Sequence, residues 1–395
     1  MGDRIILHCD LNNFFASVSL LFNPTLYDVP IAVCGSKEQR HGIVLAKNEL
    51  AKSYGVKTAE AIFEAQAKCP DLVILPPIMD KYKEYSRLAH EIYCRYTDMV
   101  EPFGIDECWL DVTGSTMLFG SGEQIANRIR NDIKRELGIT ASVGVSFNKV
   151  FAKLGSDMKK PDAVTVISRE NFKEKVWRLP ASDLLYVGKR TAERLRSSGI
   201  VTIGDICLCS DNMLKRMLGK SGVELKKYAM GEDDSPVAST EDEYIPKSIG
   251  RSVTYAKDFE TEDEVEKTFF ELAENISDNL RKYGLYAGGI QVHIRYTSLA
   301  VKEFSRALKS PTNSALLLAR GGMDLFRQNC NMTQPLRSVG IRAINLKDDN
   351  TAVQQDIFGE TENDAKIEQI EDSMYKLRKK FGNDSIKRGR TIENS

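Results

Sequence analysis

The stretch RIILHCDLNNFFAS, residues 4–17, begins with an apolar run that leads to a carboxylate. A short apolar run bounded by polar residues predicts a buried β-strand, here from Arg4 to Asp10. Phe14 and Phe15 then open an apolar segment that predicts a helix. Asp10 is therefore expected at the end of a buried strand, immediately before the first turn of a helix.

Two more carboxylates lie in the turn of a predicted hairpin. Residues 100–112 predict two strands joined by the turn Gly104-Ile105-Asp106-Glu107. Another strand is predicted at 139–147, and Asn148 is expected to cap a helix that Pro161 ends. Residues 80–96 carry aromatic and aliphatic side chains at helical spacing. The N-terminal part of the chain is therefore expected to mix strands and helices in one α+β domain.

Carboxylates at converging strand ends suit one kind of chemistry in particular. Two-metal phosphoryl-transfer enzymes hold a pair of Mg²⁺ ions ~3.5–4 Å apart between such carboxylates. Asp10, Asp106 and Glu107 have the side chains and the predicted positions for this role. An isolated acid at a strand end is more often an ordinary surface residue. The assignment therefore depends on the sequence around these three residues.

Three stretches resemble, in the same order, the motifs of Y-family DNA polymerases. They are LHCDLNNFFAS at 7–17, IDECWLD at 105–111, and VGVSFNKVFAKL at 143–154, which continues to DMKKP at 157–161. Weaker similarity extends from Arg4 to about Leu346. Asn12 resembles the polymerase V-like branch, whereas the short chain resembles the polymerase IV-like branch. The branch therefore stays open.

The resemblance implies a reaction and the residues that perform it. Y-family enzymes carry out template-directed, low-fidelity DNA synthesis past damaged template positions, by two-metal nucleotidyl transfer. The implied cofactors are two Mg²⁺ ions, for which Mn²⁺ can substitute. Asp10 and Asp106 would bind both ions, Glu107 would bind the ion at the primer terminus, and the Leu11 carbonyl would add one oxygen ligand.

A triphosphate site is implied by the same motifs. The backbone amides of Phe14 and Phe15 would hold the triphosphate together with Lys52 and Lys160. This set is chemically consistent, because Lys supplies a point charge and backbone N–H groups contact phosphate oxygens without side-chain bulk. Lys52 stands where Arg is common in the family, which makes the contacts in the fingers less certain than the metal ligands.

Phe15 matches the aromatic steric gate that excludes a 2′-hydroxyl from the sugar pocket in these enzymes. Spacing alone would favour a core aromatic, since Phe15 opens an apolar helix. Two other positions near the site depart from the family's pattern. Gly104 stands where Ser is frequent, and Glu49 stands where many members have Tyr.

The resemblance implies a right-hand architecture for the whole chain. A palm at 1–167 would contain inserted fingers at about 20–77, and a helix-hairpin-helix thumb would follow at 168–232. Residues 233–246 are acidic and predict a linker. After them, strands near 247–255, 289–297, 301–309 and 336–346 alternate with helices near 261–283 and 313–327. This βαββαβ order predicts a ferredoxin-like little finger at 247–346, with helices on one face of a four-stranded sheet.

A basic stretch at 189–227 is the strongest sign of nucleic-acid contact. Residues 184–192 predict a helix-hairpin-helix turn, in which Gly188, Lys189 and Arg190 would contact a DNA phosphate. Tyr186 occupies the usual first glycine position of that turn, so a plain basic helix pair remains an alternative. In the little finger, Arg251 would lie along the DNA backbone, and a solvated sheet face is the alternative there.

Residues 347–395 form a polar tail that contains the peptide QQDIF at 354–358. This pentamer resembles the segment that bacterial polymerases insert into a sliding clamp, with Gln354, Ile357 and Phe358 as the contacting residues. Pentamers of this kind also arise by chance. A helix is predicted near 367–381.

Composition sets the remaining expectations. A chain of 395 residues that is 42% hydrophobic excludes a small disulfide-stapled protein and a disordered one. Its eight cysteines form no CxxC pair, and no stretch has membrane-spanning length. The expected protein is a cytoplasmic bacterial monomer that works at the nucleoid on primer-template DNA and deoxynucleoside triphosphates. The rival hypothesis is a DNA-binding accessory protein of the same fold that has lost efficient catalysis.

Overall fold

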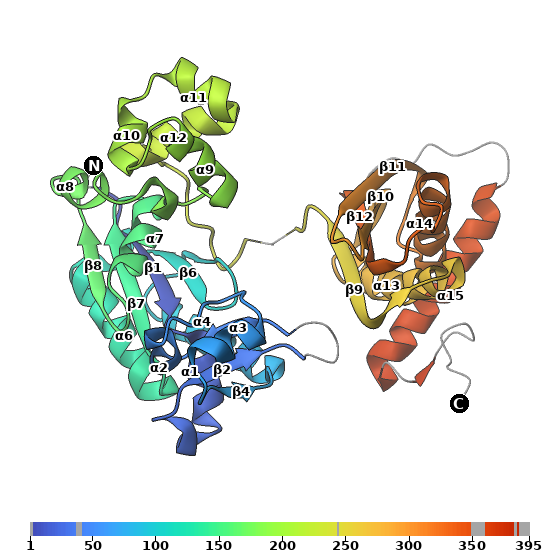
Figure 1. The fold of residues 1–395 in the computed structure, drawn as a ribbon, viewed down its shortest axis with the longest axis horizontal. Coiled ribbons are helices and arrows are strands. Elements are labelled where there is room, and N and C mark those ends of the chain that lie inside the picture. The colour runs from blue at the N-terminus through green and yellow to red at the C-terminus, as the bar shows by residue number, and fades with distance from the viewer. Residues whose placement is uncertain (1–2, 37–41, 243–244, 349–359, 383–384, 387–395) are drawn as a thin grey trace. The chain divides into compact units, whose positions relative to one another are not determined.

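The computed structural model describes residues 3–36, 42–242, 245–348, 360–382 and 385–386. The described residues form two compact units, one of residues 3–36 with 42–242 and the other of the residues from 245 onward (Figure 1). The first unit contains every predicted metal and triphosphate residue.

A five-stranded sheet with the order β5-β6-β1-β7-β8 forms the centre of the first unit. β1 lies in the middle, where it pairs antiparallel with β6 and β7, and all of its residues are buried. The predicted strand at 4–10, the hairpin at 100–112 and the strand at 139–147 are thereby confirmed. The strands are β1 (Ile6–Leu11), β5 (Val100–Pro102), β6 (Glu107–Asp111), β7 (Ala141–Ser146) and β8 (Val164–Ile167).

Helices cover both faces of this sheet. Side chains alternate between the faces of a strand, so Leu7 and Cys9 on one face pack with the three helices α1 (Phe14–Leu21), α4 (Met79–Tyr93) and α6 (Gly122–Leu137). On the other face, Ile6 packs against α7 (Lys149–Met158). The predicted cap of α7 is confirmed, because the Asn148 side chain accepts a hydrogen bond of 2.8 Å from the Phe151 amide.

Gly144 of β7 sets the distance between the sheet and α7. A Cβ at this position would collide with the carbonyl oxygen of Ala152. Only glycine therefore permits this close approach of helix and strand. The approach brings the next residue of α7, Lys153, against the end of β1.

A smaller layer is inserted between α1 and α4, where the fingers were predicted. Its sheet has the order β3-β2-β4 and a separate buried core of small and aliphatic side chains. Two short helices complete it, and Lys52 lies on the first of them. The elements are β2 (Ile31–Cys34), β3 (Val44–Lys47), α2 (Glu49–Ser53), α3 (Ile62–Lys68) and β4 (Val73–Leu75).

A group of short helices follows β8 and contains the basic stretch. Their common core packs with Phe147 and Phe151 at the start of α7, so the group is anchored on the sheet domain. The elements are α8 (Phe172–Val176), α9 (Lys189–Ser197), α10 (Ile203–Leu208), α11 (Asp211–Leu218) and α12 (Lys220–Met230). Between β6 and α6 lies a further single turn, α5 (Thr116–Phe119).

The first part of the acidic segment at 233–246 is packed against the sheet domain. Val237 is 1% exposed and lies among apolar side chains of β1, β6 and α7. Beside it, Glu101 accepts a hydrogen bond of 2.9 Å from the Ala238 amide, and the Thr240 amide donates one of 2.9 Å to the Asp98 carbonyl. Acidic composition predicted a linker throughout, but one buried valine and these backbone bonds fix residues up to Thr240.

The second unit has the predicted βαββαβ order. Its antiparallel sheet has the strand order β11-β10-β12-β9, so β12 separates β9 from β10 and β10 separates β11 from β12. Each helix therefore connects two strands that are separated by a third, which is the split βαβ arrangement. The elements are β9 (Ile249–Phe259), α13 (Glu262–Lys282), β10 (Leu285–Tyr296), β11 (Val301–Thr312), α14 (Ala315–Asn329) and β12 (Leu336–Asp348).

β10 begins at Leu285, earlier than the predicted start at residue 289. The strand continues through Gly288 and Gly289, with a shift in register between Ala287 and Gly289. Glycine is common at such irregularities because a side chain would prevent the close approach of neighbouring backbone. A Cβ on Gly288 would lie 2.6 Å from the Asn345 carbonyl oxygen.

The polar tail contains the predicted helix, α15 (Glu360–Phe381), which packs on the helices of the second unit. Its Glu371 is 4% exposed and accepts hydrogen bonds from the Ala315 and Leu316 amides, at 2.8 and 3.1 Å. Glu371 also lies 3.3 Å from the Arg281 guanidinium. A carboxylate at the N-terminus of α14 satisfies free amides and the helix dipole. Gln354, Ile357 and Phe358 lie outside the described residues.

All eight cysteines are free thiols, as the absence of paired cysteine motifs predicted. In the part of the chain that the structure describes, no helix is both long enough and apolar enough to cross a membrane.

Candidate active site

Three carboxylates gather at one end of the central sheet. Asp10 lies directly opposite Glu107 in the β1–β6 pairing, so their side chains are on the same face of the sheet. The residues next to this pair, Leu11 and Asp106, are joined by a hydrogen bond of 3.0 Å from the Leu11 amide to the Asp106 carbonyl. The antiparallel register thus brings together residues that lie far apart in the sequence.

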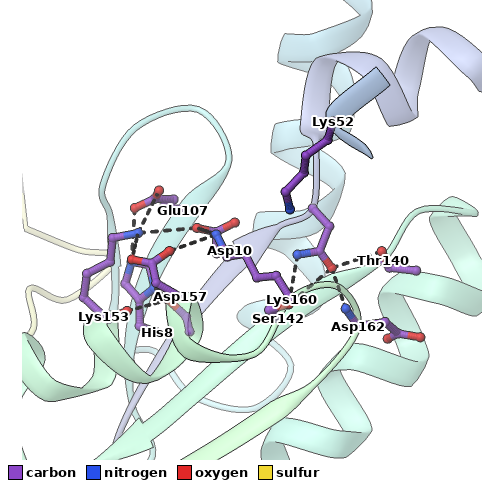
Figure 2. A network of polar contacts seen from close by, with 12 residues as sticks. His8, Asp10, Lys52, Glu107, Thr140, Ser142, Lys153, Asp157, Lys160 and Asp162 are labelled. Atoms are coloured by element: carbon purple, nitrogen blue, oxygen red, sulfur yellow. Dashed lines mark hydrogen bonds and ion pairs between the residues drawn. The ribbon is translucent and has the colours of Figure 1, made fainter. Parts of the chain in front are cut away.

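Two lysines from the third motif contact two of these carboxylates, Asp10 and Glu107 (Figure 2). Lys153 Nζ is 3.0 Å from Glu107 Oε1 and 3.4 Å from Asp10 Oδ2. Lys160 Nζ is 2.7 Å from Asp10 Oδ2. Asp157, one helical turn after Lys153 on α7, contacts both ammonium groups, at 3.2 Å from Lys153 and 2.9 Å from Lys160. The sequence analysis did not assign Lys153 or Asp157 a role.

The imidazole of His8, on β1, contacts the Glu107 carboxylate. Its ring is fully buried, with Nδ1 2.8 Å from the Ser156 hydroxyl. Nε2 lies 3.3 Å from Glu107 Oε2, but in a geometry that makes no hydrogen bond. Burial lowers the pKa of His8, which favours a neutral ring. Glu107 Oε2 therefore keeps unused capacity to bind a cation.

The carboxylates differ in their affinity for protons. Burial raises the pKa of Asp106 to about 6, and the nearby charges of Asp10 and Glu107 act in the same direction. Burial also raises the pKa of Asp10, although Lys160 opposes this. Burial would raise the pKa of Glu107 too, but the nearby Nε2 of His8 and the Lys153 ammonium lower it. The raised pKa of Asp106 therefore reflects its burial first and the neighbouring carboxylates second.

The donor set fits a divalent cation. Carboxylate and carbonyl oxygens are the ligands that Mg²⁺ and Mn²⁺ prefer, and Asp10, Asp106, Glu107 and Leu11 supply them. Among the described residues, however, no three metal-binding side chains converge closely enough to hold an ion in the observed arrangement. Lys153 lies between Asp10 and Glu107, so cation binding between these two carboxylates requires the Lys153 ammonium group to move aside.

The N-terminus of α1 has no side-chain cap. Asn13 precedes the helix, and its side chain accepts no hydrogen bond from the first amides of the helix, which include those of Phe14 and Phe15. Its side chain instead donates a hydrogen bond of 2.9 Å to Glu49, which lies 3.3 Å from Lys52. Figure 2 shows the Lys52 side chain extending from α2 toward the end of β1.

Phe14 and Phe15 have different surroundings. Phe14 is 3% exposed and belongs to the core, whereas Phe15 is half-buried. The Phe15 ring stacks on Tyr82, with centroids 4.3 Å apart and an angle of 11° between the rings. Tyr82 is itself fully buried, and its hydroxyl is 2.7 Å from that of Ser19. Phe15 is thus supported on one face by a buried aromatic ring and remains partly exposed.

A cavity of about 480 Å³ opens between α4 and the turn that carries Asp106. Leu11, Glu107 and Ile105 line it from the sheet side, and Tyr93 lines it from α4. The end of the sheet that carries Asp106 and Glu107 therefore adjoins a cavity on its α4 side.

The predicted DNA contacts lie on exposed surfaces. Gly188 precedes α9, and Lys189 and Arg190 form its exposed first turn. Tyr186 has a φ of 71°, the left-handed conformation that glycine adopts most readily, so the hairpin geometry survives without the usual glycine. Arg251 is exposed on the edge strand β9, opposite Ile341, and so lies on the helix-bearing face of the sheet.

Comparison with known proteins gives the family of this chain. Residues 9–157 match the impB/mucB/samB family, and residues 246–357 match the C-terminal domain of that family. The chain belongs to the impB/mucB/samB family. This family member is 47% identical to the DNA polymerase IV of Acetivibrio thermocellus, over 98% of its own length and 97% of the relative's. It is 37% identical to DNA polymerase IV 1 of Bacillus subtilis, over 99% and 94% of the two chains.

A solved structure supports the same grouping at the level of the fold. A Y-family DNA polymerase chimera of Dbh and Dpo4 superposes on this family member with a TM-score of 0.78 and 24% identity. The superposition covers 87% of this chain and 99% of the other. The predicted right-hand fold with a little finger is thereby confirmed. The predicted resemblance to Y-family enzymes is also confirmed, and the relatives place the chain on the polymerase IV-like branch.

Proposed function

We propose that this protein extends a primer along a DNA template, including past damaged positions. The observation that carries the proposal is the gathering of Asp10, Asp106 and Glu107 at one sheet end, in a chain 47% identical to a DNA polymerase IV. The 3′-hydroxyl of the primer would attack the α-phosphorus of a deoxynucleoside triphosphate. One P–O bond forms, another breaks, and pyrophosphate leaves.

The carboxylates and the Leu11 carbonyl would hold two Mg²⁺ ions, for which Mn²⁺ can substitute. Bound there, the ions would lower the pKa of the primer hydroxyl and offset the charge of the leaving pyrophosphate. Lys160 and Lys52 would bind the triphosphate together with the first amides of α1. Phe15 would occupy the volume that a 2′-hydroxyl needs.

The wider architecture supports this assignment. We assign the palm to 1–167 with the fingers at about 20–77, the thumb to 168–232, and the little finger to 247–346. Residues 233–246 connect them, and 347–395 form the tail. We further propose that the protein works as a monomer in the bacterial cytoplasm, at the nucleoid.

Primer extension decides between this function and a catalytically weak accessory protein of the same fold. The purified chain, Mg²⁺ and the four deoxynucleotides should extend a labelled primer on an undamaged template and past a template lesion. DNA binding without extension would favour the accessory protein.

The thumb should bind DNA without regard to sequence. Replacing both Lys189 and Arg190 with Gln should flatten the dependence of log Kd on log salt by about 0.9 for each phosphate that the variant no longer neutralises. The measurement is a fluorescence anisotropy titration of primer-template DNA at several salt concentrations. Lys173→Gln with Arg178→Gln removes the same charge outside the hairpin and should leave the slope nearly unchanged. An unchanged slope in the hairpin variant would argue against its contact with DNA.

The tail peptide should bind a sliding clamp. Ile357→Ala with Phe358→Ala should abolish stimulation of extension by the clamp, because a few apolar side chains carry most of the affinity of such peptides. Extension without the clamp should be unaffected. Gln355→Ala, within the same peptide, is the matched control and should retain stimulation. Equal stimulation of the double variant would show that the similarity of this pentamer to clamp peptides is accidental.

A further inference from the structure

Asn12, two residues after the metal-binding Asp10, is 4% exposed, and both ends of its side-chain amide are hydrogen-bonded. Its Oδ1 accepts from the Asp162 amide at 2.8 Å, from the Thr140 hydroxyl at 3.1 Å and from the Ser142 hydroxyl at 3.3 Å. Its Nδ2 lies 2.9 Å from the same Ser142 hydroxyl. A backbone N–H can only donate, so the contact with Asp162 fixes which end of the Asn12 amide is the oxygen.

The Asp162 amide belongs to the turn that carries Lys160. Helix α7 ends at Met158, and Lys160 lies between that end and Asp162. From the other side, Arg130 donates to the Asp162 carbonyl and carboxylate, at 2.7 and 2.8 Å. Lys134 is 3.0 Å from the same carboxylate. The turn is therefore held from α6 on one side and by Asn12 on the other.

These two anchors are not equivalent. The Lys134 side chain is 61% exposed, and those of Arg130 and Asp162 are 23% and 22% exposed, so water and salt weaken their attraction. Asn12 and Ser142 are buried, where hydrogen bonds are stronger and an unpaired polar group is more costly. The buried anchor should therefore determine where the turn lies relative to β1.

We propose that Asn12 is a positioning residue for Lys160. By holding the Asp162 amide, it keeps the Lys160 ammonium beside Asp10, where the incoming triphosphate would meet both the metals and the lysine (Figure 2). Asn12 itself contacts neither substrate nor metal in this role. The inference rests on the proposed function, because the triphosphate contact of Lys160 is part of that function.

The test compares two substitutions of Asn12 that differ in one property. Asn12→Leu has a similar size but no acceptor for the Asp162 amide, whereas Asn12→Asp keeps an oxygen in that place. On a primer-template ending in a dideoxynucleotide, Asn12→Leu should raise the Kd of the incoming nucleotide about tenfold. Asn12→Asp should recover most of that loss, and kcat of Asn12→Leu on an extendable primer should stay within about threefold of the parent.

Thr140→Val is the matched control, since it removes another donor to Asn12 Oδ1 and leaves the Asp162 bond in place. Its nucleotide Kd should stay within about twofold of the parent. If Asn12→Leu does not yield folded protein, Asn12→Ala removes the same acceptor with less steric demand.

A double-mutant cycle with Lys160→Ala separates positioning from general damage. If Asn12 acts through Lys160, Asn12→Leu should have almost no further effect on nucleotide Kd once Lys160 is Ala. Equal tenfold losses in both backgrounds would overturn the inference while leaving the role of Lys160 intact. An unchanged Kd in Lys160→Ala alone would instead overturn the triphosphate assignment of Lys160, and the inference with it.

Discussion

Asp106→Ala and Glu107→Ala should each abolish primer extension while leaving primer-template binding nearly intact. The ions that these carboxylates hold act on charge that develops only in the transition state, and such stabilisation is worth several kcal/mol. That corresponds to a loss in rate on the order of 10³-fold or more. Single-turnover extension with saturating nucleotide measures the loss, and fluorescence anisotropy measures DNA affinity.

A matched variant on the same strand makes this result specific. Asp111 lies at the opposite end of β6 from Glu107, where it contacts Arg4 and Thr113 rather than the cluster. Asp111→Asn removes one carboxylate from the strand and should retain extension. Near-normal extension by either Asp106→Ala or Glu107→Ala would refute the assignment of metal ligands. Loss of DNA binding in these variants would indicate a general defect of the sheet end instead.

The three carboxylates could be predicted because local patterns define strand ends. An apolar run followed by Asp10, and a tight turn that carries Asp106 and Glu107, determine the elements without reference to the rest of the chain. Their convergence depended on the resemblance, since no local pattern specifies that β1 pairs with both β6 and β7.

The partners of these carboxylates could not be predicted in the same way. Lys153 and Asp157 are common residue types on a helix. The contacts of Lys153 with Asp10 and Glu107 depend on how closely α7 approaches the sheet. Gly144 indicates this approach in the sequence, because a glycine inside a strand often marks a close approach of backbone. The bonds of Asn12 connect residues more than a hundred positions apart, and periodicity contains no information about such pairs.

The acidic segment illustrates a different limit. Charge and proline predicted an acidic linker at 233–246, and they gave no sign that residues including Val237 and Ala238 pack on the sheet domain. One apolar side chain in a polar stretch is too weak a signal to outweigh the composition. In the folded protein, the Val237 side chain is enough to hold this segment on the sheet domain, because Ile6 and Trp109 form an apolar site for it.

Phe15→Ala should relax the selection against ribonucleotides while retaining deoxynucleotide incorporation. A ribonucleotide differs by one hydroxyl, and an aromatic ring in the volume that this group needs can exclude it. Truncation opens that volume, so discrimination should fall by a factor on the order of 10²–10³, equivalent to ~3–4 kcal/mol. The ratio of kcat/KM for the two sugars, measured in the parent and in Phe15→Ala, gives the result.

The neighbouring Phe14 provides the control that separates a gate from a core residue. Phe14 is 3% exposed, so Phe14→Ala should destabilise the fold by ~3–5 kcal/mol. It should lower kcat/KM for ribonucleotides and deoxynucleotides by the same factor. Phe15 is half-buried and rests on the fixed ring of Tyr82, so its truncation removes a stacking contact but should leave a smaller cavity. Thermal unfolding of both variants accompanies the kinetics. If Phe15→Ala lowered the melting temperature as much as Phe14→Ala and left the sugar ratio unchanged, Phe15 would belong to the core, and sugar selection would need another residue.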